Sequence, residues 1–154
     1  MLTRSEPKSS KVILSNGTVL LVDDDVSHAN VASGLILAIG FEVIVANGGE
    51  EAVREYLAHA GEIVLVLMNV AMPGMGGLEA TRLIRKSNPE AKVILSAGNW
   101  EFFPADLAEA EADAFLPKPY SYADLRIIFQ HVLHRRPHAQ PDPGAPRREL
   151  VESD

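Results

Sequence analysis

Three aspartates follow one another directly after a short apolar run. The run 18–22 is rich in valine and leucine, and Asp23, Asp24 and Asp25 come next. Adjacent carboxylates repel one another unless a cation or an ammonium group lies near them. Carboxylate oxygens are also the ligands that Mg²⁺ prefers. The acidic run therefore suggests a site for a hard metal ion or a metal-bound phosphate, although an aspartate here can equally cap the next helix.

Three more polar residues follow apolar runs later in the chain. They are Asn69 after 63–68, Ser96 after 91–95, and Lys118 two residues after 114–116. An amide oxygen can join a metal site, and a hydroxyl and an ammonium group suit phosphoryl oxygens. If the fold brings these groups to the acid pair, the set is far more specific than any of its members.

The elements that must position these residues alternate between strand and helix. Strands are expected at 18–22, 41–46, 63–68, 91–95 and 114–116, with helices at 27–39, 50–59, 78–86, from 104 to about 111, and from 121 or 122 to 134. This alternation predicts an α/β fold, a doubly wound five-stranded parallel sheet in the order 2-1-3-4-5 with helices on both faces. In such a sheet, ligands bind at the carboxyl ends of the strands, where the polar residues would meet.

The first helix carries apolar residues at helical spacing. Val31, Leu35 and Ile39 recur along 27–39, with Ala29 and Ala32 beside them. This spacing predicts a helix over 27–39.

Composition narrows the function classes. The chain has 154 residues, 47% of them hydrophobic and 23% charged, a formal net charge of −7, and no cysteine. This excludes disulfides, zinc-thiolate sites and thiol chemistry, and it does not suggest a nucleic-acid surface. No apolar run approaches the roughly 20 residues that span a bilayer. We expect a cytoplasmic protein with no nucleic-acid or membrane partner, made of a flexible lead (1–16), one domain (17–134) and a disordered proline-rich tail (135–154).

Four segments together resemble the receiver domain of two-component response regulators. They are Leu21-Val22-Asp23-Asp24, Met68-Asn69-Val70-Ala71-Met72-Pro73-Gly74-Met75, Ile94-Leu95-Ser96-Ala97 and Phe115-Leu116-Pro117-Lys118-Pro119. They occur in the family's order and spacing and cover about residues 17–134. The resemblance implies a flavodoxin-like receiver fold, a phosphorelay function without enzymatic activity of its own, and a histidine kinase or another signalling protein as partner.

The resemblance also implies roles for single residues. Asp23 and Asp24 would help bind Mg²⁺, with the carbonyl of Ala71 as a further ligand, and position 69 would accept the phosphoryl group. Ser96 would contact the phosphate, Lys118 would pair with it ahead of a cis-proline, and Phe115 would switch rotamer. Two simpler readings stay open, because Ser96 can merely satisfy backbone groups at a strand end and Phe115 can be a core residue.

The resemblance fails at the phospho-acceptor. Asn69 stands where the family has aspartate, and a neutral carboxamide is a very poor nucleophile, so no acyl phosphate is expected. Losing one charge beside Mg²⁺ forfeits about 4 kcal/mol of attraction per unit charge of the ion, at a separation of ~4 Å and an effective dielectric near 20, so Mg²⁺ binding is predicted to be weak or absent. Gly76 is a second departure, because the family usually has aspartate there, and it suggests altered chemistry in the loop.

Two functions from the same family therefore compete. The first is a degenerate receiver that binds partners independently of phosphorylation. The resemblance implies that it does so through the helix from 104 to about 111, the strand 114–116 and the helix from 121 or 122 to 134. The second is an ordinary phosphorylatable single-domain regulator in which Asn69 was introduced by engineering. A Mg²⁺-dependent phosphatase with Asp23 or Asp24 as nucleophile is disfavoured, because nothing supplies a second catalytic group. The sequence leaves homodimerisation open.

Overall fold

The structure is a computed structural model that describes residues 16–98, 108 and 110–135. Its strands are β1 (Thr18–Val22), β2 (Glu42–Ala46), β3 (Ile63–Asn69), β4 (Val93–Ala97) and β5 (Ala114–Pro117). Its helices are α1 (Val26–Ile39), α2 (Gly49–Ala58), α3 (Gly77–Ser87) and α5 (Tyr122–Leu133). The predicted elements that fall on described residues are all present.

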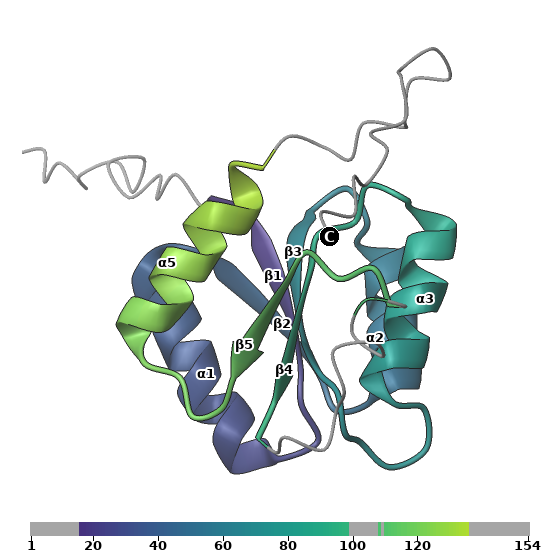
Figure 1. The fold of residues 1–154 in the computed structure, drawn as a ribbon, viewed down its shortest axis with the longest axis horizontal. Helices are drawn as coiled ribbons and strands as arrows, with labels where there is room; N and C mark the ends of the chain where they lie inside the picture. Colours follow the sequence, from purple (N-terminus) through teal and green to yellow (C-terminus); the bar gives the residue numbers. More distant parts are fainter. Residues whose placement is uncertain (1–15, 99–107, 109, 136–154) are drawn as a thin grey trace, which may run out of the picture.

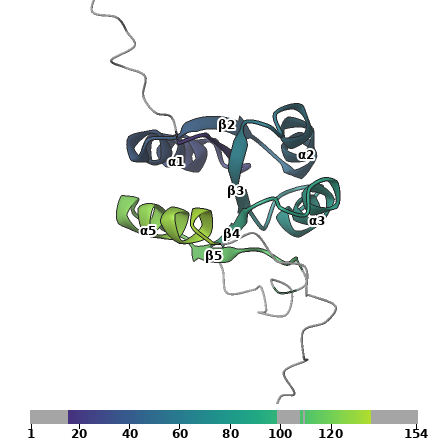
Figure 2. The same cartoon turned by 90° about the horizontal axis from the view of Figure 1, so that it is seen from above.

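The strands form one parallel sheet in the order β2-β1-β3-β4-β5, which confirms the predicted topology. Helices α1 and α5 cover one face of the sheet, and α2 and α3 cover the other (Figure 1). The view from above shows the sheet as the middle of three layers (Figure 2). The order places β1 and β3 side by side at the centre, so the acidic run lies next to Asn69 at the same edge.

The central strands are buried because their side chains alternate between two apolar cores. Leu20 and Val22 of β1 face the core that α2 and α3 close, and Val19 and Leu21 face the core that α1 and α5 close. All five residues of β1 are buried, which explains why the run is continuously apolar and does not alternate with polar residues. A strand held on both faces is a rigid support for the polar residues after it.

Helix α1 packs most of its apolar residues against the sheet, including the partly buried Leu35 and Ile39. Its buried residues are Ala29, Ala32 and Ile36, whereas Val31 is 66% exposed. Because α1 contains no aspartate, glutamate, lysine or arginine, its sequence pattern does not single out one face. The small alanines let the helix approach the sheet closely, and the bulkier Val31 is left outside.

Some predictions fall outside the described residues. These are most of the helix expected from 104 to about 111, the lead apart from its last residue, and the tail after 135. At the boundary of the described part, the guanidinium of Arg135 donates to the carbonyl of Asp113 (2.8 Å). Among the helices that the structure describes, none is long and apolar enough to span a bilayer.

Candidate functional site

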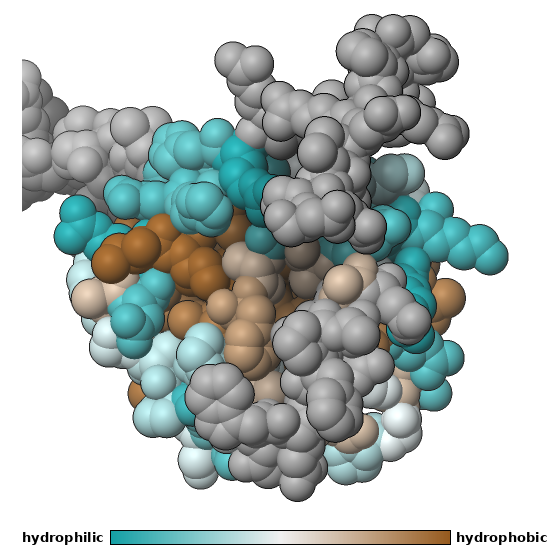
Figure 3. Space-filling model, in the orientation of Figure 1, coloured by the Kyte–Doolittle hydropathy of each residue, from teal (hydrophilic) through white to brown (hydrophobic). Residues whose placement is uncertain are grey.

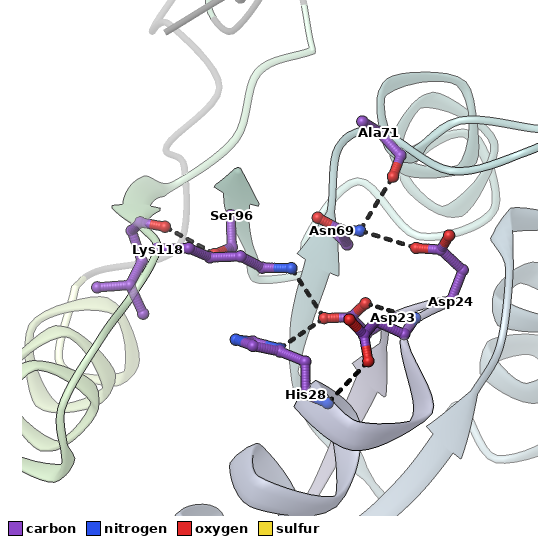
Figure 4. Close-up of polar contacts among 9 residues, drawn as sticks. Asp23, Asp24, His28, Asn69, Ala71, Ser96 and Lys118 are labelled. Carbon is purple, nitrogen blue, oxygen red and sulfur yellow. Dashed lines mark hydrogen bonds and ion pairs between the residues drawn. The ribbon is translucent and has the colours of Figure 1, made fainter. Parts of the chain in front are cut away.

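The polar residues singled out in the sequence lie along the carboxyl edge of the sheet (Figure 4). Asp23 and Asp24 follow β1, Asn69 ends β3, Ser96 lies in β4, and Lys118 follows β5. The register pairs Asn69 with Ser96, which sets these two residues side by side on neighbouring strands. Strand order therefore assembles the cluster from segments that are far apart in the chain.

Asp23 is the most highly connected residue of the cluster. It is 2% exposed, and its Oδ2 accepts from Lys118 Nζ (2.9 Å) and from His28 Nδ1 (2.7 Å). Its Oδ1 accepts from the backbone N–H of Asp25 (3.0 Å). Both carboxylate oxygens are thus held by protein donors.

These contacts determine the ionisation of Asp23. Burial alone raises the pKa of this carboxyl, but the hydrogen bonds from Lys118 and from the Asp25 backbone, and then the charges of Lys118 and His28, lower it by more. The net pKa of Asp23 therefore lies below its ordinary value of 3.8. At neutral pH, Asp23 is a buried anion that faces the ammonium group of Lys118.

Asn69 uses its side-chain amide as a double donor. Its Nδ2 lies 3.1 Å from Asp24 Oδ1 and 3.0 Å from the carbonyl oxygen of Ala71, and the residue is only 8% exposed. Figure 4 shows Asn69 between these two acceptors, on the side of Asp23 away from His28. The amide nitrogen therefore bridges two of the oxygens that the sequence suggested as metal ligands.

The three aspartates have three different surroundings. Asp23 is buried and paired, Asp24 is exposed and accepts from Asn69, and Asp25 caps α1 by accepting from the backbone N–H of His28 (3.1 Å). The capping alternative is thus correct for Asp25 alone. Within the described residues, no group of three or more histidine, aspartate or glutamate side chains is arranged to hold a metal ion.

Ser96 and Phe115 differ in how they relate to the cluster. Ser96 is buried, and its hydroxyl donates to the carbonyl of Leu116 on β5 (2.7 Å), as the strand-end alternative describes. Phe115 is 37% exposed, so the core alternative for this residue is wrong. The phosphate contact of Ser96 and the rotamer switch of Phe115 stay predictions from the resemblance.

Two neighbouring glycines shape the start of α3. Gly76 is the N-cap of α3 and has no side chain to cap it, so the missing aspartate there weakens a helix start. A Cβ at Gly77 would collide with the backbone carbonyl of Asn69. Gly77 therefore permits the close approach of α3 to the end of β3, which holds Asn69 in place.

His28 is a member of the cluster that the sequence did not reveal. It lies on the first turn of α1, where the Asp25 cap sets the helix start, and its ring stands edge-on to Tyr120 (centroids 5.3 Å apart). Burial, and then the charge of Asp23, raises the pKa of Tyr120. A polar ring at this turn, five residues after Asp23, was the available signal. The peptide bond between Lys118 and Pro119 is cis, as the resemblance implies.

Comparison with known proteins agrees with this geometry. Residues 19–130 match the response regulator receiver domain family. Part of the CAI-1 autoinducer sensor kinase/phosphatase CqsS from Vibrio cholerae is 45% identical over 118 residues, which is 74% of this chain and 16% of that protein. Transcriptional regulatory protein CpxR from Escherichia coli is 32% identical over 117 residues, which is 76% of this chain and 49% of that protein. The chain thus spans half or less of these relatives.

Solved structures share the fold. A response regulator receiver domain protein from Clostridium thermocellum superposes with a TM-score of 0.71 at 28% identity, covering 76% of this chain and 94% of that one. A chain of the CheX-CheY-BeF3-Mg complex from Borrelia burgdorferi gives a TM-score of 0.69 at 30% identity, covering 75% of this chain and 90% of that one. The sheet order, the acid–lysine pair at its carboxyl edge and the family match over residues 19–130 lead to one conclusion: this chain belongs to the response regulator receiver domain family.

Proposed function

We propose that this receiver domain of two-component signalling is degenerate at its phospho-acceptor and acts as an interaction module independent of phosphorylation. The observation that carries the proposal is the state of Asn69. Its side chain has no carboxylate nucleophile, and its amide nitrogen is engaged by Asp24 and by the Ala71 carbonyl. A carboxamide in this position neither attacks a phosphoryl donor nor accepts the resulting acyl phosphate.

The face of β5 and α5 supports partner binding as the output. Phe115 of β5 and Ile127 of α5 are 37% and 67% exposed, and Ile127 borders a pocket together with Ala114 and Leu116 of β5. Figure 3 shows hydrophobic side chains gathered over the middle of α5 and toward β5. Exposed apolar side chains on neighbouring elements are a common feature of protein interfaces. We propose that a histidine kinase or another signalling protein in the cytoplasm binds this face, and that the domain itself catalyses no reaction.

The same site supports a second candidate, a phosphorylatable regulator in which asparagine replaced aspartate at position 69 by engineering. The observation in its favour is the intact pair between Lys118 and Asp23, with Nζ and Oδ2 2.9 Å apart. A pocket that keeps this pair needs only a carboxylate at 69 to regain its nucleophile. Under either candidate, Asn69→Asp restores phosphorylation.

Intact mass spectrometry after incubation with acetyl phosphate and Mg²⁺ tests the proposal. We expect the mass of the unaltered chain to stay constant and that of Asn69→Asp to rise by one phosphoryl group. Asn30→Asp is the matched control, because it makes the same chemical change at an exposed position of α1. A phosphoryl group on the unaltered chain, lost on Asn69→Ala, contradicts the proposal. If Asn69→Asp folds but gains no phosphoryl group, the pocket differs from a phosphorylatable one at further positions besides 69.

A further inference from the structure

The receiver fold implies a divalent cation at this edge of the sheet, and the donors and acceptors here test whether one fits. The oxygens suggested as ligands belong to Asp23, Asp24 and the carbonyl of Ala71. Each of these three residues already accepts at least one hydrogen bond from a protein N–H through these oxygens. Asp23 accepts from Lys118, His28 and the Asp25 backbone, and the other two accept from Asn69.

The hydrogen bonds leave little room for a divalent cation among these ligands, and the charges at the site also argue against one. Asp23, the one buried carboxylate among the suggested ligands, faces the ammonium of Lys118 at 2.9 Å. Asp24 is exposed, and solvent and the Asn69 amide stabilise its charge. Asparagine at position 69 adds no charge of its own. The pocket therefore has no excess of buried negative charge that would attract a dication, and Mg²⁺ does not fit the residues present.

The position of the Asn69 nitrogen indicates what replaces the cation. A metal ion in this pocket would join the segment after β1 to the loop between β3 and α3 through oxygen ligands. Asn69 Nδ2 joins the same two segments, because it donates to Asp24 on one and to Ala71 on the other. Gly77 keeps the end of β3 close to α3, so the amide is held between its acceptors.

We infer that the Asn69 carboxamide is a built-in substitute for the metal ion, an amide clamp that fixes the Asp24 segment to the Ala71 segment without a divalent cation. The inference rests on the proposed function and extends it, because it explains how a receiver without phosphorylation keeps one pocket geometry. The clamp makes the folded state independent of Mg²⁺. A partner then meets the same surface whatever the concentrations of metal and phosphodonor.

Thermal unfolding in EDTA and in excess Mg²⁺ tests the clamp. We expect the Tm of the unaltered chain to be the same in both solutions. Asn69→Asp places a second carboxylate against Asp24, so its Tm should fall in EDTA and rise by about 5 °C or more with Mg²⁺. Asn69→Ala removes the clamp without adding charge, so its Tm should be lower than that of the unaltered chain and unaffected by Mg²⁺. Asn30→Asp should behave like the unaltered chain.

Two results overturn the inference. One is a Tm of the unaltered chain that rises with Mg²⁺ as much as that of Asn69→Asp. The other is an Asn69→Ala variant as stable as the unaltered chain. If Asn69→Asp fails to fold, Mn²⁺ is added to the unaltered chain and its backbone amide signals are recorded. Broadening of these signals at the pocket would overturn the inference, and unchanged signals would support it. A chain that binds Mg²⁺ but takes no phosphoryl group refutes the clamp alone, whereas phosphorylation of the unaltered chain refutes the proposed function.

Discussion

Replacing Lys118 by methionine removes the positive charge that faces the buried carboxylate of Asp23. The side chain of Lys118 is 17% exposed, and its Nζ lies 2.9 Å from Oδ2 of Asp23, whose side chain is 3% exposed. Methionine keeps the apolar stem of the side chain, so the change acts mainly on the charge. We expect Asp23 to be left with its two weaker supports, the His28 ring and the backbone N–H of Asp25.

The magnitude follows from the geometry of the pair. At 2.9 Å the direct attraction is about 6 kcal/mol for an effective dielectric of 20, and the cost of desolvating both groups offsets most of it. Removing one partner of a buried pair typically costs about 3–5 kcal/mol, because the other charge is left uncompensated. Since Asp23 keeps other donors, we expect the lower end, about 3 kcal/mol, or a Tm lower by roughly 10 °C.

The assay is urea unfolding of the unaltered chain and of Lys118→Met, each at neutral and at acidic pH. The pKa of Asp23 in the folded chain lies below 3.8, so its stabilising contribution is complete above that pH and is lost as the pH falls through the lowered value. The difference in unfolding free energy between the unaltered chain and Lys118→Met should therefore be largest near pH 7 and shrink below about pH 4. Lys86→Met, at an exposed position of α3, should change the unfolding free energy by less than about 0.5 kcal/mol.

A double-mutant cycle identifies the partner. In the background of Asp23→Asn the buried charge is absent, so Lys118→Met should cost less than about 1 kcal/mol. An equal loss in both backgrounds, or a loss that stays constant from neutral to acidic pH, would refute the claim that the ammonium of Lys118 acts by neutralising Asp23.

Two other perturbations test the loop and the partner face. Gly77→Ala forces a Cβ against the Asn69 carbonyl and should lower the free energy of unfolding in urea by about 1–3 kcal/mol. In Gly76→Ala, the new Cβ meets its nearest neighbour at 3.4 Å, so the loss should be less than about 1 kcal/mol. Equal losses in the two variants would contradict the close approach of α3 to β3. Ile127 is 67% exposed on α5, so Ile127→Asp should change the free energy of unfolding by no more than about 0.5 kcal/mol. The same change should reduce capture of a cognate kinase in a pull-down at least about tenfold. Unchanged capture would contradict a partner site on this face.

The strand-end residues were the part of the site that could be predicted from the sequence. A strand buried on both faces reads as a continuous apolar run, so the ends of 18–22 and 63–68 were visible, and with them the positions of Asp23 and Asn69. Parallel topology then brings such ends to one edge, which predicts that Lys118 and Asp23 lie near each other. The structure places Nζ and Oδ2 2.9 Å apart.

Side-chain direction was the part that could not be predicted. His28 reaches Asp23 because the Asp25 cap fixes the first turn of α1, and a polar ring five residues after Asp23 is too common a pattern to predict that contact. The exposure of Val31 was not predictable either, because a helix without aspartate, glutamate, lysine or arginine shows no clear polar face. The amide orientation of Asn69 depends on which acceptors surround it, and these come from two loops whose conformation the sequence does not specify.

The most direct check of the amide clamp is the side-chain NH₂ signal of Asn69 in ¹H–¹⁵N spectra, assigned by its absence from Asn69→Asp. If both protons are donated to Asp24 and Ala71, the pair exchanges slowly with solvent and does not shift or broaden when Mg²⁺ or Mn²⁺ is added. A fast-exchanging pair, or one that Mn²⁺ bleaches together with the backbone amides of Asp23 and Asp24, would show that the pocket holds a metal ion and that the amide does not take its place.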